Sequence, residues 1–310
     1  MCPPSGTLEG VETTDAPNQP INPGFAETPN LPEGRALTLP GRGTTFIRDI
    51  PAAASQRSTA PTIILIHGWT VTTDLNFHQV FFPLAEKTGA RIIGMDQRGH
   101  GRGIRPRALF RLDECADDIA ALIDELKLER VIVIGYSMGG AIAQWLAKRH
   151  PDKLLGAVFC ATTCHFGPEE KKLGMWDFLM PALATGLTVM PSSMRHAALS
   201  RVAMFRRTEE VPNWMREEAG RSDPAMIVQA GIVIGKFDAR PWLHRLTLPT
   251  AVVKTTQDTT VSPRRQQLLI DGLPNVSVHE CNADHRAAVS HPKRYVHAVV
   301  EAVASIQARS

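Results

Sequence analysis

The fold is decided by residues 130–151, RVIVIGYSMGGAIAQWLAKRHP. The apolar run at 130–134 is typical of a strand that is buried on both faces of a sheet. A helical pattern begins at Met138 and ends before Pro151, which cannot continue a helix. Between the two lies GYSMG at 135–139, which predicts a sharp strand-to-helix turn with a serine at its apex.

The predicted turn would present the hydroxyl of Ser137 to a reacting group. A G-x-S-x-G pattern between a strand and a helix is typical of a nucleophilic serine on a strained backbone. Gly135 and Gly139 are small, so neighbouring backbone can pass close to the turn. The helix that follows points its first N–H groups at the place where negative charge would develop. An ordinary glycine-rich turn is the alternative interpretation.

Strands and helices alternate on both sides of this turn. The expected strands are 36–39, 44–50, 62–66, 91–95, 130–134, 154–161, 250–254 and 276–280. The expected helices are 76–87, 113–126, 138–150, 263–270 and 292–306. This order predicts an α/β fold with a mainly parallel sheet and helices on both faces.

Two segments interrupt the alternation. Residues 1–34 contain seven prolines and almost no apolar periodicity, so they predict a disordered tail that cannot bury enough surface to offset its ordering entropy. Residues 164–240 lie between two expected strands, look helical and hold seven of the ten methionines. We interpret them as an inserted helical cap. The α/β core would then comprise residues 35–163 and 241–310.

Composition limits the class of protein. A chain of 310 residues with 43% apolar content can form one large core, with or without an inserted subdomain. The net charge of +3 does not suggest a nucleic-acid partner. The five scattered cysteines are typical of reduced thiols. No signal-peptide pattern and no apolar run of about 18 residues is present, so we expect a soluble, cytoplasmic protein.

Three motifs together resemble the α/β-hydrolase superfamily. GYSMGG at 135–140 is similar to its nucleophile turn, His67-Gly68-Trp69 to its oxyanion loop, and DQRGHGRG at 96–103 to its D-x-R-G-x-G turn. The resemblance covers residues 36–163 and 241–308. It implies an α/β-hydrolase fold with an inserted cap and a Ser-Asp-His serine hydrolase of the esterase or lipase kind, without a cofactor or a metal.

The resemblance also implies which residues act as base and acid. A serine hydroxyl is too weakly acidic to attack unaided, so it needs a positioned base. The family has the chain order Ser, Asp or Glu, His. His285 follows the last expected strand, and Asp258 follows the strand at 250–254, which are the family's positions for base and acid. His291 is the alternative base.

Two positions near these residues differ from the family pattern. Thr255 stands three residues before the expected acid, and Asp284 stands directly before the expected base. The family often has glycine at both positions. Because Asp284 carries a charge, it is a candidate for changing the basicity of His285.

The oxyanion donors are expected to be backbone N–H groups. The turn supplies that of Met138, the residue after the nucleophile, and the resemblance implies that of Trp69. His67 and Gly68 are expected to shape the loop, and the turn at 96–103 is expected to be structural.

A basic run and an apolar stretch allow two interpretations each. The run contains no acid from its first to its last arginine. It could bind an anionic substrate tail or an acidic membrane surface, or it could form a solvated loop with Arg98 buried in the turn, which we favour. It comprises Arg98, Arg102, Arg105, Arg107 and Arg111. Within the cap, residues 173–194 carry one charge, Asp177, and would line an acyl pocket or form the cap's own core. Contact of the cap with a membrane surface is left open.

These patterns predict a serine hydrolase that cleaves a carboxylic ester of a small or medium apolar acyl group through an acyl-enzyme. The expected partner is a small-molecule ester, with no nucleic acid and no transmembrane segment, and the oligomeric state is not predicted. Alternatives are a carbon–carbon bond hydrolase or a cofactor-free perhydrolase with the same triad, and a non-catalytic ligand receptor on a hydrolase scaffold. Epoxide hydrolases and dehalogenases of this fold use Asp where this chain has Ser137.

Overall fold

The computed structural model of the protein describes residues 29–56, 60–167, 186 and 211–310. The first 28 residues of the predicted tail lie outside this description, and so do residues 168–185 and 187–210 of the predicted cap. Within the described ranges, no helix has both the length and the apolar content to cross a bilayer.

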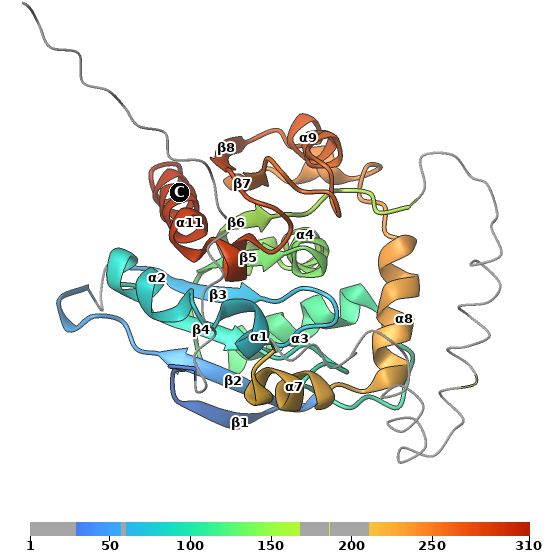
Figure 1. The fold of residues 1–310 in the computed structure, drawn as a ribbon. Coiled ribbons are helices and arrows are strands. Elements are labelled where there is room, and N and C mark those ends of the chain that lie inside the picture. The colour runs from blue at the N-terminus through green and yellow to red at the C-terminus, as the bar shows by residue number, and fades with distance from the viewer. Residues whose placement is uncertain (1–28, 57–59, 168–185, 187–210) are drawn as a thin grey trace, which may run out of the picture.

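Eight strands form one sheet in the order β1-β2-β4-β3-β5-β6-β7-β8 (Figure 1). In chain order the strands are β1 (Gly34–Leu39), β2 (Gly43–Ile50), β3 (Thr62–Ile66), β4 (Ile92–Met95), β5 (Val131–Tyr136), β6 (Leu154–Cys160), β7 (Thr250–Thr255) and β8 (Val276–Cys281). From β4 to β8 all neighbours are parallel, while β1 and β2 pair antiparallel at one edge. The predicted α/β fold with a mainly parallel sheet is confirmed.

Helices cover both faces of this sheet. In the core they are α1 (Thr73–Phe77), α2 (Phe81–Thr88), α3 (Leu112–Glu125), α4 (Met138–Arg149), α9 (Pro263–Gly272), α10 (Ala287–Ser290) and α11 (Pro292–Gln307). Ile119 of α3 and Ile142 of α4 belong to the buried cluster on one face, and Leu84 of α2 and Val299 of α11 belong to the cluster on the other. All four side chains are fully buried or nearly so, so the sheet is a two-sided hydrophobic support for the loops at its ends.

The helix expected at 76–87 is two helices in the structure. The chain leaves the helical path after α1 and begins α2 at Phe81. A continuous helix would place Pro83 in its interior, where the ring lacks an N–H and would collide with the carbonyl of Gln79. Starting a new helix at Phe81 puts the proline in the first turn, where no donor is needed.

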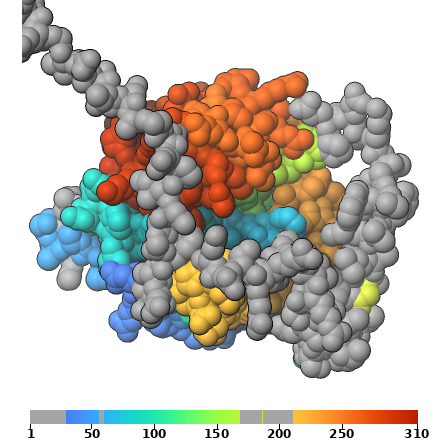
Figure 2. All heavy atoms as spheres, viewed as in Figure 1, coloured from blue at the N-terminus to red at the C-terminus, as the bar shows by residue number. Residues whose placement is uncertain are grey.

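The described part of the predicted cap contains α7 (Asn213–Gly220) and α8 (Pro224–Gly235). Hydrogen bonds join this segment to the loops that follow β3 and β4. They run from Asp223 N to Gly99 O (2.8 Å), from Gly101 N to Ser222 Oγ (3.0 Å) and from the Trp69 indole N to Ile227 O (2.8 Å). Figure 2 shows the gold atoms of α7 against the blue atoms of the N-terminal strands. This part of the chain is therefore fixed to the core by directional bonds.

The basic run is used for internal contacts. Arg98 is buried and makes two 2.7 Å bonds to the carboxylate of Asp118. Arg102 bonds to Asp74 (2.7 Å) and to Glu218 of α7 (2.8 Å). The expected burial of Arg98 is confirmed, while Arg102 joins the loop after β4 to α7 and is not simply solvated.

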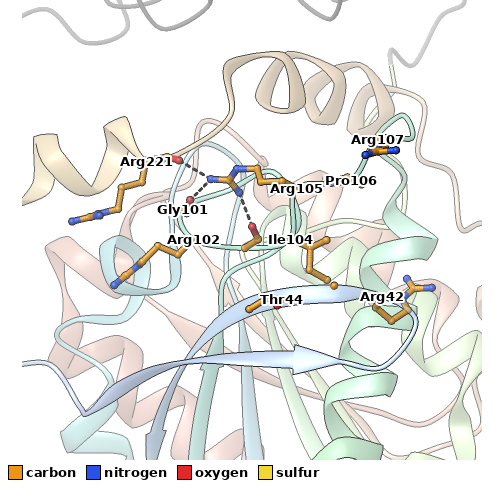
Figure 3. A pocket seen from close by; sticks show the side chains of 11 residues that line it. Arg42, Thr44, Gly101, Arg102, Ile104, Arg105, Pro106, Arg107 and Arg221 are labelled. Atoms are coloured by element: carbon orange, nitrogen blue, oxygen red, sulfur yellow. Dashed lines mark hydrogen bonds between the residues drawn. The ribbon is translucent and has the colours of Figure 1, made fainter. Parts of the chain in front are cut away.

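Arg105 shows the same use of a guanidinium group. It bonds to the backbone carbonyls of Gly101, Gly103 (2.7 Å) and Arg221 (2.7 Å), as Figure 3 shows. A surface cavity of about 790 Å³ lies beside this loop, and Arg102 and Arg105 are among its lining residues. The guanidinium groups of Arg102 and Arg105 are already bonded within the fold.

A close approach between β3 and α4 makes one glycine indispensable to this packing. A Cβ atom at Gly139 would lie 2.0 Å from the carbonyl oxygen of Ile66 and 2.8 Å from that of His67. We expect Gly139→Ala to lower the free energy of unfolding by at least about 3 kcal/mol, because backbone must move to admit the methyl group. Gly235→Ala, where nothing lies within 4 Å, is the control and should change it by less than about 1 kcal/mol. Equal values for the two variants in urea unfolding would contradict this account.

Candidate active site

Ser137 occupies a strained turn between β5 and α4. Its backbone has φ 53° and ψ −115°, which a residue with a side chain rarely adopts. Three hydrogen bonds hold its backbone there, from Ser137 N to Cys160 O (2.9 Å), from Thr162 Oγ1 to Ser137 O (2.8 Å) and from Gly140 N to Ser137 O (2.9 Å). A strained residue persists only where its surroundings determine its conformation. The strand-to-helix turn predicted from the sequence is present.

The structure brings together the three side chains that were predicted as a triad. His285 Nε2 lies 3.0 Å from Ser137 Oγ, and His285 Nδ1 lies 2.7 Å from Asp258 Oδ2. Ser137 follows β5, Asp258 follows β7 and His285 follows β8. Parallel strands end at the same edge of the sheet, which is where ligands bind in open α/β folds.

The direction of these hydrogen bonds follows from chemistry. An ionised carboxylate can only accept, so the imidazole donates its Nδ1 proton to Asp258. The lone pair on Nε2 then faces the hydroxyl of Ser137, which is the arrangement a general base needs. The other oxygen of Asp258 accepts from the backbone N–H groups of Thr260 and Val261, each at 2.8 Å. The acid is thus held from both sides while 2% exposed.

The predicted oxyanion donors lie next to Ser137. Met138 is the first residue of α4, and Trp69 follows β3 in a loop that approaches the serine. A Cβ atom at Gly68 would lie 3.5 Å from Ser137 Cβ, and Gly68 N donates to Asn76 Oδ1 at 2.8 Å. The backbone N–H groups of Met138 and Trp69 stay the predicted donors to a substrate oxygen.

His67 ties this loop to the turn after β4. Its Nε2 accepts from Gln97 N at 2.9 Å, so the ring proton is on Nδ1, which donates to Gly68 O at 2.8 Å. Complete burial lowers the pKa of His67 to about 3, with the nearby His100 contributing in the same direction. The imidazole is neutral and shapes the loop, as the sequence predicted.

The other candidates near His285 are directed elsewhere. His291 precedes α11, and its Nδ1 lies 2.9 Å from Ser290 Oγ. Asp284 accepts from Arg286 N at 2.9 Å and from Ser290 Oγ at 3.1 Å. Its carboxylate therefore caps the turn that begins α10.

Residues that were not predicted from the sequence hold the three side chains in place. The hydroxyl of Tyr136 donates to His285 O at 2.7 Å, which fixes the backbone of the base. The hydroxyl of Thr255 lies 2.9 Å from Asp258 Oδ2, and the amide of Gln266 bonds to Thr255. The departure from glycine at Thr255 was visible in the sequence, but nothing there linked it to a glutamine on the next helix.

The chain is similar to known α/β hydrolases. The sequence model of a family described as "alpha/beta hydrolase fold" matches residues 61–188. A 3-oxoadipate enol-lactonase 2 from Acinetobacter baylyi is 24% identical over 209 residues, which are 67% of this chain and 76% of that protein. A pimeloyl-[acyl-carrier protein] methyl ester esterase from Chromobacterium violaceum is 27% identical over 251 residues, which are 78% and 93%. Several other relatives match over about a third to a half of their own length.

A solved structure shows the same fold over most of the chain. The enol-lactonase from Burkholderia xenovorans LB400 has a TM-score of 0.66 and 20% identity, and the match covers 87% of this chain and 100% of that one. The chain has the α/β-hydrolase fold, and it is similar to members of the α/β-hydrolase superfamily. It is an enzyme of the hydrolase class.

The positions of His285 and His291 allow a direct test of which histidine acts as the base. We expect His285→Ala to lower kcat by at least about 10⁴, because the nucleophile loses its base. His291→Ala removes the same ring six residues later and should stay within about threefold of the wild type. The measurement is kcat and KM of both variants, with folding checked by circular dichroism. Equal losses in two folded variants would remove His285 from this role.

Proposed function

We propose that this protein hydrolyses a carboxylic ester of a small or medium apolar acyl group through an acyl-enzyme on Ser137. The observation that carries the proposal is the unbroken series of hydrogen bonds from Ser137 Oγ through the imidazole of His285 to the carboxylate of Asp258. A serine activated in this way attacks an electrophilic carbonyl carbon.

In the first half-reaction, Ser137 Oγ bonds to the acyl carbon while His285 Nε2 takes the hydroxyl proton. The carbonyl oxygen becomes negative and accepts hydrogen bonds from the N–H groups of Met138 and Trp69. The carbon–oxygen bond to the leaving group then breaks, and His285 gives its proton to the departing alcohol. The products of this step are the free alcohol and the acyl-enzyme.

In the second half-reaction, a water molecule attacks the acyl carbon and His285 takes one of its protons. The bond to Ser137 Oγ breaks, and the proton returns to the serine as the carboxylic acid leaves. Asp258 stays ionised throughout and stabilises the imidazolium that forms in each half.

The class of substrate is inferred from two sources. Two relatives carry names that specify ester chemistry, an enol-lactonase and a methyl ester esterase, and a lactone is a cyclic ester. The apolar acyl group is inferred from the composition of the predicted cap, whose residues 173–194 carry one charge. A small-molecule ester is therefore the proposed partner.

The nucleophile can be tested by covalent labelling. We expect wild-type protein to react with a fluorophosphonate probe and Ser137→Ala to remain unlabelled, because the probe needs an activated serine. The same variant should lose about 10⁶ in kcat toward an ester. Mass spectrometry of the labelled peptide locates the site. Labelling of the alanine variant at the wild-type rate would identify a different serine.

A second outcome separates the proposed reaction from its alternatives. A protein that is labelled at Ser137 but turns over no ester would favour carbon–carbon or peroxide chemistry at the same triad. Slow single turnover with retained product would favour a ligand receptor.

The acyl preference is tested with p-nitrophenyl esters of graded length. Each methylene buried in an apolar pocket contributes up to about 0.8 kcal/mol of binding. We therefore expect kcat/KM to rise from the C2 ester through C4 and C6 and then to level off, since remote binding helps to hold the acyl group in place. A steady decrease from C2 onward would restrict the substrate to small acyl groups.

A further inference from the structure

Two donors share one oxygen of the acid. Asp258 Oδ2 lies 2.7 Å from Nδ1 of His285 and 2.9 Å from Oγ1 of Thr255. Thr255 is the last residue of β7 and is 1% exposed, so its hydroxyl has no access to bulk water. The oxygen that faces the base is therefore also bonded to a hydroxyl that is not part of the triad.

The direction of the Thr255 hydroxyl is fixed by Gln266 of α9, which is fully buried. Thr255 N–H can only donate, and it lies 2.9 Å from Gln266 Oε1, so the orientation of the amide is determined. Its Nε2 then faces Val261 O at 2.8 Å, the hydroxyl of Thr255 at 2.9 Å and Thr255 O at 3.1 Å. Since the Nε2 group can only donate and an ionised carboxylate can only accept, the single proton of the Thr255 hydroxyl is directed to Asp258.

We propose that Thr255 is a positioning residue that sets both the orientation of Asp258 and the share of its negative charge that reaches the imidazole of His285. This inference rests on the proposed function, because it concerns how the acid of the same proposed triad is positioned. Glycine, common at this position in the family, could not supply the hydroxyl. Gln266 acts one step further out by orienting Thr255.

The neighbourhood supports an effect on basicity. Among the described residues, Asp258 is the only ionisable partner within ion-pair distance of the His285 imidazole. The carboxylate of Asp284 is paired with the Arg286 side chain at 3.3 Å. A hydrogen bond to a carboxylate stabilises its charge and weakens its pull on another proton. Without the Thr255 hydroxyl, the carboxylate should hold the imidazolium form more firmly.

The test compares two isosteric changes in one strand. Thr255→Val removes the hydroxyl that faces Asp258. Thr250→Val makes the same chemical change at the other end of β7, where the fully buried hydroxyl donates to Asn275 O at 2.7 Å. Thr255→Val loses the bonds of this hydroxyl to Asp258 and from Gln266, whereas Thr250→Val loses one bond. A purely structural role therefore predicts lower stability in both variants but no change in the pH midpoint or in the Nδ1 resonance.

We expect Thr255→Val to lower kcat for p-nitrophenyl butyrate roughly tenfold with KM little changed, because a misplaced acid costs rate more than binding. The midpoint of its kcat/KM profile against pH should move upward by about half a pH unit. Its His285 Nδ1 proton should shift in the proton NMR spectrum. Thr250→Val should match the wild type in all three measurements.

A second pair keeps the test valid if the valine variant does not fold. Thr255→Ser and Thr255→Ala both lose the methyl group and differ only in the hydroxyl. Serine should recover the wild-type profile and alanine should reproduce the valine effects. Identical profiles and Nδ1 resonances for serine and alanine would overturn the inference.

The outcomes also separate this inference from the proposed function. If the wild type shows no turnover that depends on Ser137, the proposed ester hydrolysis fails, whereas the Nδ1 resonance still tests the hydroxyl. If turnover depends on Ser137 but Thr255→Val behaves like Thr250→Val, the positioning role alone is overturned.

Discussion

The strained backbone of Ser137 is the constraint on which the rest of the site depends. At φ 53° and ψ −115° the serine is stable only because β5, β6 and α4 hold the turn from all sides. Gly139 lets α4 begin against the carbonyl of Ile66, which places the first N–H of that helix beside the nucleophile. The packing around the turn thus offsets the backbone strain and fixes the position of the Ser137 hydroxyl.

The elements that could be predicted from the sequence are those with a local cause. Apolar runs such as residues 62–66 reappear as strands, because a strand buried on both faces needs little beyond its own composition. The break between α1 and α2 was missed, although Pro83 provided the signal for it. The family pattern identified Ser137, Asp258 and His285, and the structure places these three within hydrogen-bond distance.

The residues that could not be predicted are those whose role exists only in three dimensions. Gln266 is an ordinary polar residue on a helix until the fold sets its amide against Thr255. Tyr136 lies in the nucleophile motif, yet its hydroxyl serves the backbone of His285, far along the chain. The arginines of the basic run were also ambiguous, because their acidic partners, such as Asp118 and Glu218, are distant in sequence.

The order of strands in the sheet has a consequence for how the enzyme loses activity. The proposed nucleophile follows a central strand, but the proposed base follows β8, which is the edge strand and has Val278 44% exposed. Edge elements open locally at a lower free-energy cost than central ones. The position of the imidazole therefore depends on the local stability of the edge strand and not on that of the central strands. Local opening of β8 would move the imidazole of His285 away from Ser137. Activity would then be lost while most of the sheet remains folded.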